Sequence, residues 1–198
     1  MSLEFVSLRG KFIEDYLDDL AQVRIEVLGE FPYLYQGKYN YEKEYLKTYS
    51  ESSNSLIEIV KADGKVVGFT TCIPLNEESN EIQLPFMHQN RDVKDIFYFG
   101  ESLVLSKYRS HDIFREFFKR MEEHANDVLG HLESTVFTSV KRSPNHSLYT
   151  QEFKHLMSFW QELGYKEHKK LYVEYTWKDI HQKSESTKKL MFWEKKWD

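Results

Sequence analysis

The feature that most constrains the fold is a strand-length hydrophobic run followed, after a short polar turn, by a long amphipathic helix. The run covers residues 96–105 and is almost entirely aromatic and aliphatic. Hydrophobic residues then recur at intervals of three and four from Ile113 to Leu129, which places them on one face of a helix. A buried strand followed by a helix that packs on it is an α/β unit, so we expect an α/β fold.

The same reasoning places the other elements along the chain. We expect helices over about 13–28, 41–49 and 153–163, and strands over 56–60, 65–69, 135–140 and 171–177. The Asp63-Gly64 step joins the first two strands as a tight hairpin, because these residues tolerate the positive φ of such a turn. We interpret residues 76–93 as a polar loop.

The chain of 198 residues is expected to form a single domain, residues 1–198. Its last segment, 178–198, is charged but also aromatic, so we expect this tail to dock on the domain or on a partner, which favours a homodimer.

Charge and composition exclude several kinds of function. The net charge of −5 argues against nucleic acid as a partner, and there is no apolar run of membrane-spanning length. The single cysteine, Cys72, is consistent with a reducing, cytoplasmic compartment. The eight histidines show no metal-ligand spacing, so no metal is expected.

Three local patterns, together with the element order, resemble the GNAT superfamily of N-acetyltransferases. They are the Asp63-Gly64 hairpin, the strand exit Leu103-Val104-Leu105-Ser106-Lys107-Tyr108-Arg109, and the segment Ser158-Phe159-Trp160-Gln161-Glu162-Leu163-Gly164-Tyr165. The resemblance covers nearly the whole chain and points to a bacterial subgroup of unassigned substrate. It implies a GNAT-like mixed, mostly antiparallel central sheet flanked by helices on both faces. It also implies acetyl-CoA (coenzyme A) as the donor.

The resemblance implies a coenzyme A loop at the start of the helix after the central strand. The loop is Arg109-Ser110-His111-Asp112-Ile113-Phe114, in which Asp112 and Phe114 replace the small residues of the family pattern. Phosphates bind the free amides of a helix N-terminus, for which an Asp112 carboxylate acting as the helix cap would compete. Arg109 and His111 can contact phosphates, although a solvated polar turn is the competing interpretation.

The resemblance also assigns chemistry to the central strand. Main-chain groups of Leu103, Val104 and Leu105 would pair with the pantetheine arm and stabilise the oxyanion, provided that the strand splays from its neighbour. Glu101, the one charged residue inside this strand, is the candidate catalytic base. The alternative is a Glu101 that faces solvent or pairs with an arginine.

The acceptor side is less well defined by the sequence. Tyr33 and Tyr35 lie between the first two helices, where GNAT enzymes bind the acceptor, and their rings could contact an ammonium group, although each could equally belong to a packed loop. Trp160 replaces a family tyrosine that serves as an acid, and an indole cannot serve as a proton donor. We therefore expect direct acetyl transfer to a small-molecule or protein amine; the alternative is a catalytically silent GNAT-like binding module with a degenerate coenzyme A loop.

Overall fold

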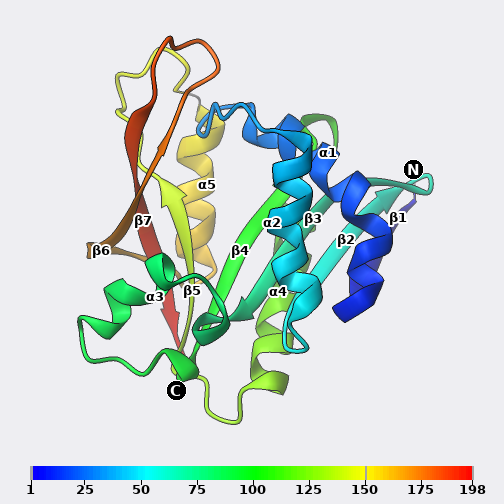
Figure 1. The fold of residues 1–198 in the computed structure, drawn as a ribbon, viewed down its shortest axis with the longest axis vertical. Coiled ribbons are helices and arrows are strands. Elements are labelled where there is room, and N and C mark those ends of the chain that lie inside the picture. The colour runs from blue at the N-terminus through cyan, green and yellow to red at the C-terminus, as the bar shows by residue number, and fades with distance from the viewer. Residues whose placement is uncertain (1, 150, 198) are drawn as a thin grey trace.

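The structure is a computed structural model that describes residues 2–149 and 151–197. A seven-stranded sheet with the order β1-β2-β3-β4-β5-β7-β6 runs through it (Figure 1). Neighbouring strands are antiparallel except for the parallel pair β4 and β5, which confirms the expected mixed, mostly antiparallel sheet. The strands are β1 Leu3–Leu8, β2 Leu56–Ala62, β3 Lys65–Pro74, β4 Ile96–Val104, β5 Ser134–Val140, β6 Lys166–Trp177 and β7 Ser186–Lys196.

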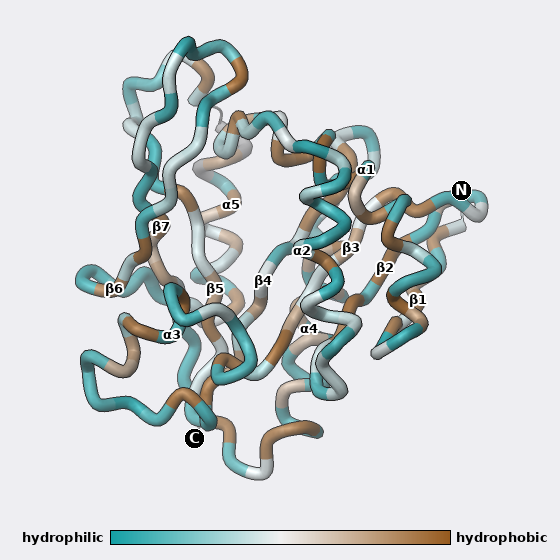
Figure 2. The backbone as a smooth tube through the Cα atoms, in the orientation of Figure 1, coloured by the Kyte–Doolittle hydropathy of each residue, from teal (hydrophilic) through white to brown (hydrophobic). Residues whose placement is uncertain are grey.

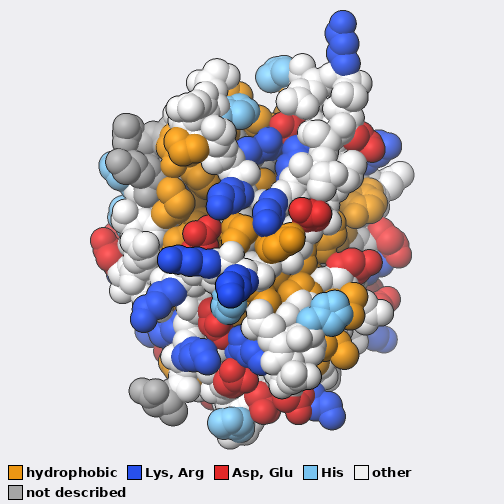
Figure 3. All heavy atoms as spheres, turned by 90° about the vertical axis from the view of Figure 1, so that its left-hand side faces the viewer, with side chains coloured by type: hydrophobic (Ala, Val, Ile, Leu, Met, Phe, Trp, Pro, Cys, Tyr) orange, Lys and Arg blue, Asp and Glu red, His pale blue; other side chains and the backbone are white. Residues whose placement is uncertain are grey.

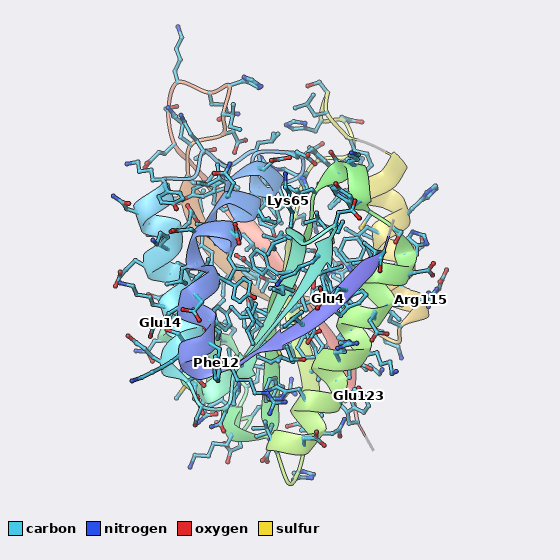
Figure 4. All side chains as sticks on the ribbon, turned by 90° about the vertical axis from the view of Figure 1, so that its right-hand side faces the viewer. Glu4, Phe12, Glu14, Lys65, Arg115 and Glu123 are labelled. Carbon is cyan, nitrogen blue, oxygen red and sulfur yellow. The ribbon has the colours of Figure 1, made fainter. Side chains whose placement is uncertain are left out.

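Helices cover both faces of the sheet, with α1 and α2 on one face and α4 and α5 on the other (Figure 1). Figure 4 shows the same two layers from the β1 edge: Phe12 and Glu14 lie on one side, and Arg115 and Glu123 on the outer surface of α4 lie on the other. The helices are α1 Leu17–Leu28, α2 Tyr39–Glu51, α3 Asn80–Met87, α4 His111–Val128 and α5 Gln151–Glu162, and short 3-10 segments are Gly10–Tyr16, Leu75–Glu77, Val93–Asp95 and Ser106–Tyr108.

The period-two alternation of strands builds a core on each face of the sheet. On β4, Ile96 and Tyr98 belong to the cluster beneath α1 and α2, whereas Phe97 and Phe99 belong to the cluster beneath α4 and α5. Both faces of the first half of this strand are therefore hydrophobic, which explains the four successive hydrophobic residues at 96–99. Figure 2 shows such hydrophobic stretches along the central strands and hydrophilic residues in the peripheral loops.

The C-terminal segment is an interior strand, not a tail laid on a finished domain. β7 lies between β5 and β6 and pairs with both in antiparallel register. Met191, Phe192 and Trp193 are buried within the sheet. The aromatic character that suggested a dimer contact is therefore explained by the core, and the homodimer stays a prediction without that support.

Strand β6 forms one edge of the sheet and is protected by charge. Lysines are exposed along its first half, at Lys166, Lys169 and Lys170. Figure 3 shows lysine and arginine side chains gathered on the side of the molecule that carries this edge. Charged edge strands resist pairing with a second sheet.

Two elements differ from the sequence expectation. Strand β1 pairs with β2 at the opposite edge, and helix α3 lies within the segment that we interpreted as a loop. Helix α3 contains Pro85 and only two buried residues, Ile82 and Phe86, so its hydrophobic pattern is too short to be recognised.

Candidate functional site

The gap between β4 and β5 is the central feature of the site. The two strands pair only over positions 96–99 and 134–137, and beyond these positions they diverge (Figure 1). The register of β4 against β3 shifts at this point, where Gly100 forms a β-bulge. A Cβ atom at Gly100 would collide with the Tyr49 hydroxyl and the Thr71 side chain, so the bulge requires glycine.

A cavity of about 1700 Å³ opens at this gap. One half is lined by the ends of β4 and β5 and by α4 and α5, and the other half by the α1–α2 loop, α2, the segment before α3 and the end of β6. The volume exceeds the ~300–1,000 Å³ typical of a pocket for one small ligand. The cavity therefore has room for more than one small ligand.

Main-chain directions on β4 correct one part of the sequence expectation. The Leu105 N–H donates to the Val67 carbonyl on β3, and the antiparallel alternation turns Leu103 towards β3 as well. Val104 faces the opposite way, and its carbonyl accepts from Arg109 Nε at 2.9 Å. Of the three predicted positions, only Val104 directs its main chain into the gap, because an alternating ladder cannot present three successive residues to one side.

The first turn of α4 is capped by Ser110, not by Asp112. Ser110 Oγ accepts from the Ile113 amide at 3.4 Å, whereas Asp112 is exposed in the first turn. The proposed capping role of Asp112 is therefore wrong, although its negative charge remains at the helix N-terminus. Among the loop residues predicted to hold the cofactor, the cavity wall includes Arg109, Ser110, His111 and Phe114, and excludes Asp112 and Ile113.

The side chains of this loop are engaged with the protein. Arg109 NH2 donates to Glu30 Oε2 at 2.5 Å, in addition to the Arg109 bond to the β4 carbonyl. The His111 ring stacks on Phe159, with ring centroids 5.1 Å apart, and Phe114 packs inwards between the two clusters on its face of the sheet. Phe114 therefore acts partly as a core residue while still contributing to the cavity wall.

Glu101 lies in the cavity wall and is held by Arg24 from α1. Arg24 Nε donates to the two carboxylate oxygens of Glu101 at 2.7 and 3.0 Å, and NH2 lies 2.7 Å from Oε1. The other end of the guanidinium forms an ion pair with Glu42 of α2, and the Tyr45 ring lies 4.2 Å from the guanidinium carbon. This arrangement matches the alternative of an arginine-paired Glu101, and a catalytic role for Glu101 stays a prediction.

Glu78 is another of the carboxyl groups in the cavity wall and lies in the turn before α3. Burial raises the pKa of Glu78 to about 7; the Ser79 amide opposes this, while the charges of Glu101 and Glu81 add to it. A carboxyl group with this pKa can accept and release protons near neutral pH. No sequence pattern indicates Glu78, because it lies in a polar stretch with other acidic residues and no periodicity.

Tyr33 and Tyr35 both line the second half of the cavity, and their contact with an acceptor stays a prediction. Tyr33 stacks on Trp177, with centroids 6.3 Å apart, and Tyr35 meets the same indole edge-on at 6.5 Å. The Tyr35 hydroxyl donates to Glu42 Oε1 at 3.1 Å. Burial raises the pKa of Tyr33 to about 12, with the Glu101 charge as the next cause, so its phenol stays neutral at physiological pH.

A buried ion network holds this aromatic segment in place. Arg142, just after β5, donates to the main-chain carbonyls of Pro32 and Tyr33 at 2.6 and 2.8 Å. Its guanidinium pairs with Asp179 at 2.9 Å, and Lys188 of β7 lies 3.0 Å from the same carboxylate. The C-terminal part of the chain thereby fixes the position of a loop near the N-terminus, a link that sequence separation conceals.

Trp160 lies in the cavity wall and belongs to the hydrophobic cluster beneath α4 and α5. Trp160 is 9% exposed and packs edge-on against Phe137 and Trp193, each at 5.0 Å.

Within the described ranges 2–149 and 151–197, no group of three His, Cys, Asp or Glu side chains could hold a metal ion. Over the same residues, no helix has the length and apolar character needed to cross a membrane.

Comparison with known proteins gives a result only at the level of structure. No protein-family model matches the sequence, and no curated protein matches it. Solved structures do match: an acetyltransferase of the GNAT family from Streptococcus pneumoniae has a TM-score of 0.60 and 11% identity, covering 99% of this chain and 100% of that one.

Two further structures have the same fold. The ribosomal-protein-alanine N-acetyltransferase from Brucella melitensis has a TM-score of 0.61 and 12% identity, covering 97% of this chain and 99% of the other. The PaiA N-acetyltransferase from Thermoplasma acidophilum, in complex with coenzyme A, has a TM-score of 0.55 and 14% identity and covers 100% of each chain. The protein therefore has the fold of the GNAT acetyltransferases, which confirms the resemblance seen in the sequence.

Proposed function

We propose that the protein is an N-acetyltransferase that uses acetyl-CoA and transfers the acetyl group directly to an amine. The observation that carries the proposal is the gap between β4 and β5, which opens the Val104 main chain into a cavity beside the first turn of α4. A fixed backbone N–H can stabilise an oxyanion, and the free amides of a first turn attract phosphate. Both requirements of the reaction thus rest on backbone groups.

The residues around the cavity fit the chemistry of coenzyme A. The donor, when bound, supplies an activated acetyl thioester. Ser110 and His111, with the amides of the first turn of α4, are suited to its phosphate groups, and Arg109 reaches the same wall. Leu103 and Phe114 provide apolar surface for the pantetheine arm. Tyr33 and Tyr35 lie in the other half of the cavity and are suited to the acceptor.

A second candidate function is a catalytically silent module with the same fold that binds a metabolite or a partner protein. Two observations favour it: Arg109 is bonded to Glu30, and Trp160, at the family position of an acid, is buried against two aromatic rings. The negative charge of Asp112 at the N-terminus of α4 also opposes phosphate binding. This module would bind no coenzyme A.

Titration calorimetry of the whole protein with acetyl-CoA separates the two functions. The enzyme requires saturable binding, followed by release of free thiol when a panel of primary amines is added. Absence of binding at millimolar acetyl-CoA would exclude the enzyme. Binding without thiol release by any amine would leave a cofactor-binding module.

A further inference from the structure

The ion cluster beneath the acceptor half of the cavity carries one more negative charge than positive. It consists of Arg24 with Glu42 and Glu101, and the three side chains are at most 11% exposed. In the part of the chain that the structure describes, no second cation forms an ion pair with either carboxylate. Buried charges are ordinarily compensated by a partner, because an isolated ion loses its hydration. The cavity thus presents an uncompensated negative charge through Glu101.

Tyrosine rings form part of the wall around this charge. Tyr33, Tyr45, Tyr98 and Tyr175 line the same half of the cavity. Burial raises the pKa of each of these phenols, with further contributions from carboxylates that include Glu101 or Glu78. These phenols carry no charge at neutral pH, and their ring faces attract cations.

Glu78 is the carboxyl group in this half of the cavity whose pKa is raised towards neutrality. Its charge interacts with that of Glu101, which places the two carboxyl groups in one electrostatic environment. Its carboxyl group accepts a hydrogen bond from the Ser79 amide. Among the described residues, it forms no ion pair. The titratable groups that face it are Glu81 on α3, Glu101 and Tyr98 on β4, Tyr45 and Tyr49 on α2, and Tyr175 on β6.

We propose that the acceptor enters as a cationic primary amine without a neighbouring carboxylate, that Glu101 and the tyrosine rings hold its ammonium group, and that Glu78 takes its proton. The inference rests on the proposed acetyl transfer and specifies the substrate class and the base at the same site. Glu101, with both oxygens bound to Arg24, serves here as the anchoring carboxylate. An amino acid would bring its own carboxylate next to Glu101 and be repelled.

The acceptor nitrogen loses two protons in this reaction, one before and one after it bonds to the acetyl group. The Glu78 carboxylate removes one proton from the ammonium group and leaves a neutral amine. The amine nitrogen forms a bond to the thioester carbonyl carbon, and the carbon–sulfur bond breaks as the tetrahedral intermediate collapses. The second surplus proton on nitrogen passes to the departing thiolate, which leaves as a thiol, and Glu78 returns its proton to solvent. No oxidant or metal is required.

Calorimetry with a matched pair of probes tests the charge class. 2-Phenylethylamine and phenylalanine share an aromatic body and an amine, and only phenylalanine has a carboxylate. We expect 2-phenylethylamine to bind more tightly by at least about tenfold, which corresponds to ~1.4 kcal/mol. Each titration is carried out with and without saturating coenzyme A, so that failure of donor binding and failure of amine selection are separate results.

Variants test the two carboxyl groups. We expect Glu101→Gln to weaken 2-phenylethylamine binding about tenfold, and Glu123→Gln, on the outer surface of α4 (Figure 4), to leave binding unchanged. We expect the wild-type rate to fall below about pH 7, and we expect Glu78→Gln to lower kcat, with little change in the KM for acetyl-CoA, and to abolish that fall.

Three results would overturn the proposed charge class of the acceptor. The first is phenylalanine binding as tightly as 2-phenylethylamine, and the second is unchanged affinity in Glu101→Gln. The third is the absence of 2-phenylethylamine binding up to about 10 mM. One ion pair should give a dissociation constant on the order of 10 mM or lower. A Glu78→Gln variant that retains the wild-type pH profile would overturn the role of Glu78 as the base. Thermal unfolding of each variant verifies that it is folded.

Discussion

Replacing Glu78 with glutamine removes a group whose charged form is costly in the folded protein. The pKa of Glu78 is raised from 4.5 to about 7, chiefly by burial. A carboxyl group with a raised pKa binds its proton more tightly in the folded state than in the unfolded state. The free energy of unfolding therefore falls as the pH rises from about 4.5 to 7, and the loss is complete above about 7.

The size of the effect follows from the two pKa values. At ~1.4 kcal/mol for each pH unit, the difference comes to about 3 kcal/mol. Water that reaches the half-buried carboxylate lowers this cost, so we expect Glu78→Gln to raise the free energy of unfolding by about 1–3 kcal/mol at pH 8. Glutamine keeps the shape of the side chain and an oxygen that can accept from the Ser79 amide.

Urea denaturation at pH 5 and pH 8 provides the measurement. At pH 5 the gain from Glu78→Gln should shrink below about 1 kcal/mol, because the wild-type carboxyl group is then protonated in the folded state. Glu123→Gln, whose exposed side chain lies near Lys119, should show no such dependence on pH. Equal effects of Glu78→Gln at the two pH values, or a loss of stability at pH 8, would refute the reasoning.

Three further changes test other parts of the site. Arg24→Met should cost ~3–5 kcal/mol in urea denaturation, because it leaves two buried carboxylates without their cation; a loss under about 1 kcal/mol would contradict the ion cluster. Gly100→Ala should cost at least ~2 kcal/mol by steric overlap, while Gly130→Ala, with no atom near an added Cβ, should change stability by under about 0.5 kcal/mol; similar effects would count against the bulge. Asp112→Asn should tighten acetyl-CoA binding about two- to fivefold, because it removes a negative charge from the first turn of α4, whereas Asp127→Asn in the last turn should not. Equal affinities of the two variants in calorimetry would show that the Asp112 charge does not oppose phosphate binding.

Elements with strong local periodicity could be predicted from the sequence. The helix stripe from Ile113 became α4, and the Asp63-Gly64 turn joins β2 and β3, because in both cases neighbouring residues decide the structure. Strand β7 could not be placed, since its position between β5 and β6 depends on partners about 20 and 50 residues earlier in the chain. The sequence shows that this segment is aromatic, but not that these residues are buried inside the sheet.

The candidate site shows the same division. Three predicted residues line the cavity: Glu101 was noticed as the one charge inside its strand, and Tyr33 and Tyr35 were chosen for their place between the first two helices. The pairing of Glu101 with Arg24 joins residues 77 positions apart, and no local pattern indicates it. The proton affinity of Glu78 arises from burial and from charges on other elements, so it exists only once the chain has folded.

The interior position of β7 has a consequence for biosynthesis. A protein is made from its N-terminus, and β7 is made after both of its partner strands, yet β5 and β6 cannot be bridged without it. Until then β5 has an open edge, and the lysines of β6 help to keep the nascent chain from pairing with its neighbours. The ion network through which Arg142 holds the aromatic loop also requires Asp179 and Lys188, which are made later. The half of the cavity that Tyr33 and Tyr35 line is therefore completed only after β7 has been made, so a chain truncated before β7 would lack a formed cavity.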